Sequence, residues 1–319
     1  MCTAPETYYR RDPTKFEGRG GLTKDPRRAL GSIGSDSQKT ITVACGKCME
    51  CRLARAREWS LRSVHEASLY DDNCFITLTY DDEHLPEDFG LHYEHFQAFM
   101  HRLRKRMPGA GRFLMCGEYG DQFGRPHFHA ILFNCGFADK KLIRAKPDPL
   151  YSSELLSDIW HNQGLASLGD VTTQSAGYVA RYSTKKIYGP GTDFVYDWIN
   201  PETGEVFKRR TPFLESSNRP GIGYEWFQRY HSDVFPCDDI VFDGRKFPVP
   251  RYYMKLYEEL DQYGAGRVSR NRAAKRVATR LEANATEYGL HDAHGKRLAV
   301  KAEIERLKSQ SIKRDKGEL

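Results

Sequence analysis

The stretch PHFHAILF, residues 126–133, decides how the rest of the sequence is interpreted. Its apolar and β-branched residues predict a β-strand. Because side chains alternate across a strand, His127 and His129 lie on one side and Phe128 on the other. Two imidazoles on one face of a sheet are two-thirds of a small metal site. A polar sheet face explains this strand equally well when it is taken alone, so further ligands have to come from elsewhere.

Composition narrows the class of protein. The chain has 319 residues, enough for a substantial core, and a formal net charge of +6, which suits a polyanionic partner without requiring one. No apolar run approaches the roughly 20 residues that span a bilayer, and the N-terminal residues lack a secretory pattern. Eight cysteines in such a chain favour a reducing compartment. We therefore expect a cytoplasmic protein with no membrane partner.

Seven elements are predicted in the middle of the chain, after a helix over 52–70. In chain order they are strand 74–80, helix 92–107, strand 112–119, strand 126–133, helix 152–160, strand 165–171 and helix 174–188. This order is the split βαβ pattern of a ferredoxin/RRM-like fold, an α+β class with an antiparallel sheet.

Composition shifts predict three regions. Residues 1–40, rich in Gly, Pro, Ser and basic residues, are expected to form a loop or extended arm. A boundary near Gly189-Pro190-Gly191 closes a domain over 41–190. The accessory region 191–319 is expected to be irregular at first and helical from Arg251. From residue 267 onward it is basic, with 14 Lys or Arg against 7 Asp or Glu.

Glu118 is the candidate third ligand for the histidine pair. It stands near the end of strand 112–119, which is expected to form a hairpin with strand 126–133. Opposed side chains in such a pair lie roughly 5 Å apart. A carboxylate there completes a His-His-Glu set with positions left open for substrate oxygens. Mixed nitrogen and oxygen ligands suit Mn²⁺, Zn²⁺ or Mg²⁺.

A second candidate metal site is CGKCMEC, residues 45–51, which supplies Cys45, Cys48 and Cys51. Structural zinc usually has four ligands, so the fourth would be Cys74, Cys116 or a histidine. Reduced thiols at a junction between loop and helix are the alternative interpretation. An iron–sulfur cluster would also need a fourth cysteine.

The predicted helix over 174–188 carries YVARYSTKK, residues 178–186. Tyr178 and Tyr182 are one turn apart and share a face, with Lys185 and Lys186 close to it. A tyrosine has a pKa of about 10 and needs a nearby cation or base to act as a nucleophile. Two packed core tyrosines before a basic helix end are the alternative.

Three motifs in this order, FITLTY at 75–80, the HxH strand and YxxxYxxKK, resemble the HUH endonucleases that initiate rolling-circle replication. The paired tyrosines are most similar to the two-tyrosine initiators of microviruses. The CGKCMECR segment and the chain length are similar to the gokushovirus branch of that family. The resemblance covers roughly residues 40–190.

The resemblance implies an HUH endonuclease fold and a reaction. A tyrosine would attack a phosphodiester of single-stranded origin DNA that is polarised by Mg²⁺ or Mn²⁺, and so begin and end rolling-circle replication of a phage genome. The residues implied are His127, His129 and Glu118 as metal ligands, Tyr178 and Tyr182 as nucleophiles, Lys185 beside the scissile phosphate, and Lys186, Arg181 and Arg125 as DNA contacts.

The resemblance and the missing motifs also imply partners and alternatives. No GxxxxGK[ST] motif is present, so unwinding would fall to a host helicase and the host replication machinery, in the cytoplasm of a bacterial host. A relaxase or transposase of the same superfamily, and a non-enzymatic DNA-binding protein with a structural metal, remain open. A hydrolase of the HxHxD type is excluded, because Ala130 to Leu132 supply no aspartate after His129.

Overall fold

The computed structural model describes residues 2, 4–10, 22–25, 27, 40–120, 124–172, 175–180, 195–201, 203–235, 239–242 and 244–260. The chain divides into two compact units, one of residues 1–54 with 278–319 and one of residues 55–277. The boundaries predicted near residues 40 and 190 do not coincide with this division. The outer strand β12 (Phe213–Ser216) lies past residue 190, yet it pairs with a strand of the central sheet.

The first unit contains a small antiparallel sheet where the sequence predicted a loop or extended arm. Its strands are β1 (Glu6–Arg10), β2 (Leu22–Thr23) and β3 (Thr40–Val43), in the spatial order β2-β1-β3. The prediction of an arm without strands was therefore wrong. The sequences ETYYR and TITV are rich in Tyr, Thr, Ile and Val, which favour strands, but they are too short to stand out among glycines and basic residues.

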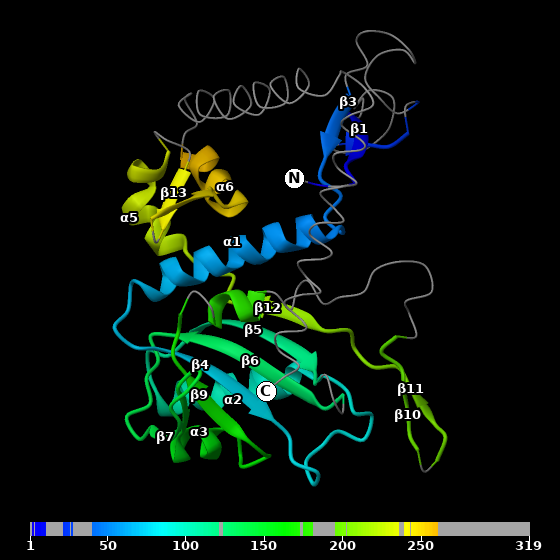
Figure 1. Cartoon of the computed structure of the whole chain (residues 1–319), viewed down its shortest axis with the longest axis vertical. Helices are drawn as coiled ribbons and strands as arrows, with labels where there is room; N and C mark the ends of the chain where they lie inside the picture. The colour runs from blue at the N-terminus through cyan, green and yellow to red at the C-terminus, as the bar shows by residue number, and fades with distance from the viewer. Residues whose placement is uncertain are drawn as a thin grey trace. The chain divides into compact units, whose positions relative to one another are not determined.

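A seven-stranded antiparallel sheet forms the centre of the second unit, in the order β12-β5-β6-β4-β9-β8-β7. Figure 1 shows β4, β5, β6 and β12 running side by side. The four strands that the sequence predicted occupy the middle of this sheet. They are β4 (Asn73–Thr79), β5 (Arg112–Tyr119), β6 (Pro126–Phe133) and β9 (Ala166–Gly169).

The predicted α+β class and antiparallel sheet are confirmed, and the arrangement is compatible with an HUH-like fold. Helix α2 (Tyr93–Arg106) joins β4 to β5, and α3 (Glu154–Ile159) precedes β9, as expected. The sequence did not predict the strands β7 (Lys141–Arg144) and β8 (Leu150–Ser152). Both are short and lie at one edge of the sheet, so they carry little alternation of apolar and polar residues.

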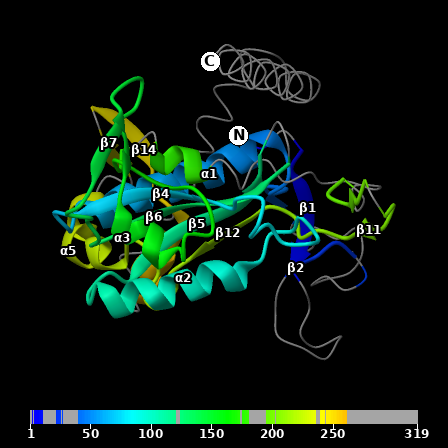
Figure 2. The ribbon, with the colours of Figure 1, turned by 90° about the horizontal axis from the view of Figure 1, so that it is seen from below.

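The two faces of the sheet are covered by different elements. On one face, Ile76 and Leu78 of β4 and Phe128 of β6 pack in one core with α2 and α3. On the other, Ile131 and Phe133 pack against α1 (Met49–Ala67) and the helical residues 175–180. Figure 2 shows α1 and α2 on opposite sides of the strands. This alternation in β6 leaves His127 and His129 on the α1 face, beyond the end of its apolar part.

The described C-terminal part is more regular than the sequence suggested. Its elements are β10 (Trp198–Ile199), β11 (Val206–Phe207), α5 (Tyr224–Val234), β13 (Asp239–Phe242), β14 (Arg245–Pro248) and α6 (Arg251–Leu260). The expectation of an irregular stretch after residue 190 was therefore wrong for these residues. Helix α6 begins at Arg251 as predicted, and the basic region from residue 267 lies outside the described residues.

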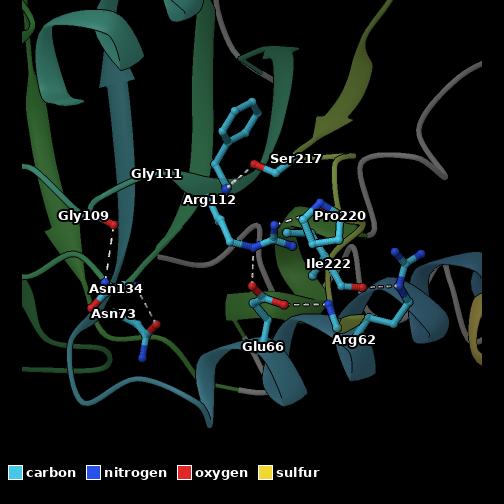
Figure 3. A network of polar contacts seen from close by, with 12 residues as sticks. Arg62, Glu66, Asn73, Gly109, Gly111, Arg112, Asn134, Ser217, Pro220 and Ile222 are labelled. Atoms are coloured by element: carbon cyan, nitrogen blue, oxygen red, sulfur yellow. Dashed lines mark hydrogen bonds and ion pairs between the residues drawn. The ribbon is translucent and has the colours of Figure 1, made fainter. Parts of the chain in front are cut away.

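A buried network of polar contacts connects α1, β5 and the loop before α5 (Figure 3). The Glu66 carboxylate accepts hydrogen bonds from the Arg112 guanidinium at 2.5 Å and from the Gly223 backbone N–H at 2.6 Å. Arg112 also donates to the carbonyl oxygen of Pro220 at 3.0 Å. These contacts hold α1 and the 220–223 segment against the sheet on the face that carries the two histidines. Among the described helices, none combines the length and apolarity required to cross a bilayer.

Candidate metal centre

The hairpin of β5 and β6 brings the predicted carboxylate to the two histidines. Glu118 is the direct partner of His127 in the antiparallel register, and His129 lies two residues further along the same face. The Glu118 Oε1 atom is 2.9 Å from His127 Nε2 and 3.1 Å from His129 Nε2. The two imidazole rings are nearly perpendicular, at 84°, with centroids 4.8 Å apart. Both Nε2 atoms therefore face the same carboxylate oxygen.

This cluster is largely shielded from water. Glu118 is 3% exposed and His129 is 6% exposed, whereas His127 is half-buried. Burial alone would raise the pKa of the Glu118 carboxyl, because it disfavours the charged form. Hydrogen bonds from His127 and His129, and their positive charge, outweigh burial and lower that pKa to about 2. Glu118 is therefore an anion across the physiological pH range.

The second nitrogen of each imidazole has a partner of its own. His127 Nδ1 lies 3.1 Å from the backbone carbonyl oxygen of Arg125, which can only accept, so Nδ1 carries the proton. His129 Nδ1 lies 2.9 Å from the Thr77 hydroxyl, which stands opposite His129 on β4. Such partners fix ring orientation and tautomer in metal sites, leaving the other nitrogen free to coordinate.

The donor set fits a divalent ion. Two imidazole nitrogens and one carboxylate oxygen, all within 4.8 Å of one another, are a ligand combination that suits Mn²⁺, Zn²⁺ or Mg²⁺. Three protein ligands leave coordination positions for oxygens of water or substrate. The residues present are thus consistent with the predicted divalent metal, and the nature of the ion is not set by the ligands.

Tyr178 lies next to this cluster. It belongs to the helical residues 175–180, whose Ala176 and Val179 are buried against the sheet. Its ring meets the His129 ring edge-on, with centroids 5.1 Å apart, and meets Phe75 in the same manner at 6.2 Å. The half-buried tyrosine is thereby positioned beside the metal ligands. The other predicted residues of this helix, Arg181, Tyr182, Lys185 and Lys186, lie outside the described residues.

Arg125, a predicted DNA contact, is engaged within the protein. Its guanidinium donates to the backbone carbonyl of Tyr80 at 2.9 Å and pairs with Asp82, beyond the end of β4. This ties the start of β6 to the end of β4, on either side of the histidine strand.

Two side chains of the site were not singled out from the sequence. Thr77 fixes His129, and Phe75 stacks on the same imidazole with centroids 5.6 Å apart and an interplanar angle of 13°. The alternation in FITLTY, which predicted one apolar and one site-lining face for β4, was the signal that could have found them.

The cysteine motif gains a fourth thiol that the sequence analysis did not consider. Cys2 joins Cys45, Cys48 and Cys51 in a cluster whose sulfur atoms all lie within 4.8 Å of one another. The expectation that Cys74 or Cys116 would supply the fourth ligand was wrong. Both are buried in the central sheet, on β4 and β5.

Comparisons with known proteins agree on one group. The family model for replication-associated proteins of the ORF2 type matches residues 73–187, which include the cluster and the tyrosine motif. "Replication-associated protein VP4" of Bdellovibrio phage phiMH2K is 36% identical over 248 residues, 72% of this chain and 74% of that protein. No solved structure matches.

Two further relatives carry similar names. "Replication-associated protein ORF2" of Spiroplasma virus 4 is 31% identical over 232 residues, covering 68% of both chains. "Replication-associated protein ORF4" of Chlamydia phage 1 is 29% identical over 235 residues, 70% of this chain and 55% of that protein.

Proposed function

We propose that this chain, which belongs to the family of phage replication-associated proteins of the microvirus type, nicks and rejoins single-stranded DNA through a tyrosine nucleophile. The cut would open an origin so that rolling-circle replication of a small phage genome can begin, and rejoining would close the copied circle. A role in replication of a phage genome follows from the family. The nicking chemistry is the proposal.

The observation that carries the proposal is the contact between His129 and Tyr178. The same imidazole that faces Glu118 on one side meets the tyrosine ring on the other, at 5.1 Å between centroids. A metal site held by Glu118, His127 and His129 therefore has a phenol beside it. Because a nucleophile must lie within about 3–3.5 Å of the atom it attacks, a phosphate bound at this metal would stand in reach of neighbouring side chains.

The fixed ligands prepare this site for a phosphate. A bound divalent ion would draw negative charge off the phosphate oxygens, which makes the phosphorus easier to attack. The Arg125 carbonyl and the Thr77 hydroxyl hold the two imidazoles in place through their Nδ1 atoms, so that the Nε2 atoms need no rearrangement when the site fills. The aromatic rings of Phe75 and Tyr178 limit the access of water to His129.

The proposed reaction exchanges one ester for another. The Tyr178 oxygen forms a bond to phosphorus, and the bond between phosphorus and the 3′ oxygen breaks. The phenol gives up its proton, and the departing 3′ oxygen gains one, so no net proton is consumed. The products are a 5′-phosphotyrosine and a free 3′-hydroxyl that can prime synthesis.

Rejoining is the same exchange in reverse and requires no nucleotide cofactor, because the phosphotyrosine keeps the energy of the broken ester. In this proposal Tyr182, one turn away, cuts the regenerated origin, and the new 3′-hydroxyl attacks the first phosphotyrosine. Lys185 would help to neutralise the scissile phosphate, and Arg181 and Lys186 would contact DNA. We further propose that a host helicase supplies unwinding and that the protein acts in the cytoplasm of a bacterial host.

Trapping the covalent intermediate tests this function. Overlapping single-stranded oligonucleotides from the encoding genome are labelled at either end, incubated with the protein and Mn²⁺ or Mg²⁺, and separated under denaturing conditions. We expect one sequence to give a protein adduct that carries the 3′-terminal label and not the 5′ label. His127→Ala should abolish the adduct, whereas His101→Ala, at an exposed position on α2, should leave it unchanged. Adduct formation by His127→Ala at the wild-type level would refute the proposal.

A further inference from the structure

We propose that Cys2, Cys45, Cys48 and Cys51 bind one structural zinc ion, at a site separate from the proposed nuclease centre. All four cysteines belong to the unit that contains residues 1–54, whereas Glu118, His127 and His129 belong to the other unit. This inference does not depend on the proposed DNA chemistry. It assigns a task to a motif that the nuclease reaction does not use.

The spacing of the sulfur atoms fits one tetrahedral ion. Zinc–thiolate bonds of about 2.3 Å arranged tetrahedrally hold the sulfur atoms about 3.8 Å apart. Cys2 Sγ lies 3.5 Å from Cys45 Sγ and 3.7 Å from Cys48 Sγ, and all four sulfur atoms lie within 4.8 Å of one another. A four-iron cluster would stand between the thiolates and hold them further apart than one ion does.

Backbone groups around the cluster support thiolate sulfurs. The Cys45 backbone N–H donates to Cys2 Sγ at 3.3 Å, and the Cys48 N–H donates to Cys45 Sγ at 3.3 Å. The second of these bonds closes the CGKC turn, where Gly46 adopts φ +72°, a conformation that favours glycine. Hydrogen bonds of this kind orient ligands and balance the negative charge of a tetrathiolate site.

The register of the small sheet explains how Cys2 reaches a motif more than 40 residues away. In the antiparallel pair of β1 and β3, Glu6 is opposite Val43 and Tyr9 is opposite Thr40. Continuing this register toward the N-terminus sets Cys2 opposite Lys47, between Cys45 and Cys48. The two strands therefore deliver the fourth thiol to the start of α1, and the ion would fasten β1, β3 and α1 together.

The residues around the cluster have little else to hold them. Among residues 1–54 whose burial is described, the buried ones are Thr23 and Glu50, and none of the three apolar cores includes a residue from this range. Small units without an apolar core commonly depend on a metal or disulfides. All seven described cysteines are free thiols, so a metal is the crosslink that this cluster offers.

Metal analysis of the full chain, purified under reducing conditions, tests the proposal. We expect one tightly held zinc per chain, which persists when His127 and His129 are both replaced by Ala. Cys2→Ser should raise the zinc dissociation constant at least tenfold, since even outer partners of ligands are worth about 10–100-fold. Cys135→Ala, a buried thiol of the second unit, is the matched control and should retain the zinc.

A second measurement on the wild-type chain keeps the test decisive if Cys2→Ser does not fold. Stepwise modification of thiols by an organomercurial should release zinc in proportion to four protected cysteines. Replacement of zinc by Co²⁺ should give the visible spectrum of a tetrahedral thiolate site. Zinc held equally well by Cys2→Ser, iron with sulfide in place of zinc, or a Cys2–Cys45 disulfide in the reduced preparation would each overturn the proposal.

Discussion

Glu118 on β5 stands directly opposite His127 on β6, with Glu118 Oε1 2.9 Å from His127 Nε2. The register of a single hairpin thus creates the contact on which the proposed metal site depends. A buried carboxylate with a pKa lowered to about 2 contributes its full negative charge to any bound cation. The first prediction concerns this charge.

Glu118→Gln should weaken Mn²⁺ binding by at least about 100-fold, because it replaces an anionic ligand in a buried site by a neutral amide of the same shape. Calorimetric titration of the wild-type and variant proteins with Mn²⁺ measures the effect. Glu215→Gln, on the neighbouring strand β12, removes the same charge from a more exposed position and should leave Mn²⁺ affinity unchanged. Equal Mn²⁺ affinity in wild type and Glu118→Gln would exclude Glu118 as a ligand.

Thr77→Val should lower Mn²⁺ affinity by about 10–100-fold through His129, because it removes the hydroxyl that lies 2.9 Å from His129 Nδ1 while keeping a β-branched side chain in the strand. Thr77→Ser retains the hydroxyl and should restore most of the affinity. The same titration measures both variants. If Thr77→Val and Thr77→Ser bind Mn²⁺ alike, the hydroxyl does not position the imidazole.

Glu66→Ala should lower the free energy of unfolding by about 3–5 kcal/mol, because it leaves the Arg112 guanidinium and the Gly223 N–H without their buried partner. Urea unfolding followed by tryptophan fluorescence gives this value. Glu259→Ala, which removes the partner of an exposed Lys255 on α6, should cost only a small fraction of that amount. A loss no larger than that of Glu259→Ala would show that the network of Figure 3 is not a stabilising element.

His65 should make stability fall as the solution becomes acidic. The side chain is packed against Trp226 and lies 3.0 Å from the Tyr253 hydroxyl, and burial lowers its pKa from 6.5 to about 3. Between these two values the unfolded chain binds a proton that the folded chain does not, so the free energy of unfolding falls with falling pH. The slope approaches about 1.4 kcal/mol per pH unit for this one group.

The control for this prediction is His65→Gln, which cannot take up the proton. Unfolding measured at several pH values from 7 to 4 should show a shallower dependence in His65→Gln than in wild type. Identical slopes in the two proteins would mean that His65 is protonated equally in the folded and unfolded states.

The residues that sequence reasoning brought together correctly are those related by local rules. Glu118, His127 and His129 belong to two strands joined by one tight turn, so alternation and hairpin pairing predict their meeting. Cys2 and Cys45 are 43 residues apart and meet through the register of β1 and β3, which no local pattern reveals. Strand β12 was missed for a related reason. It joins β5 after a long connection, and its four half-buried residues show little alternation.

Contacts between elements were equally hidden from the sequence. The Glu66–Arg112 pair joins a helix to a strand 46 residues later, and its formation depends on how α1 packs on the sheet. In contrast, the alternation in β4 did separate the buried Ile76 and Leu78 from the site-lining Thr77. The roles of Thr77 and Phe75 needed the register of β4 against β6 as well.

Identification of the amino acid that carries DNA tests the central claim most directly. After reaction with single-stranded origin DNA and Mn²⁺, the adduct is digested with protease and nuclease, and the modified peptide is sequenced by mass spectrometry. We predict a phosphonucleotide on Tyr178 or Tyr182, no adduct from the double variant Tyr178→Phe/Tyr182→Phe, and a normal adduct from Tyr151→Phe on β8. An adduct of wild-type yield in the double variant, or DNA attached to any other residue, would contradict the account.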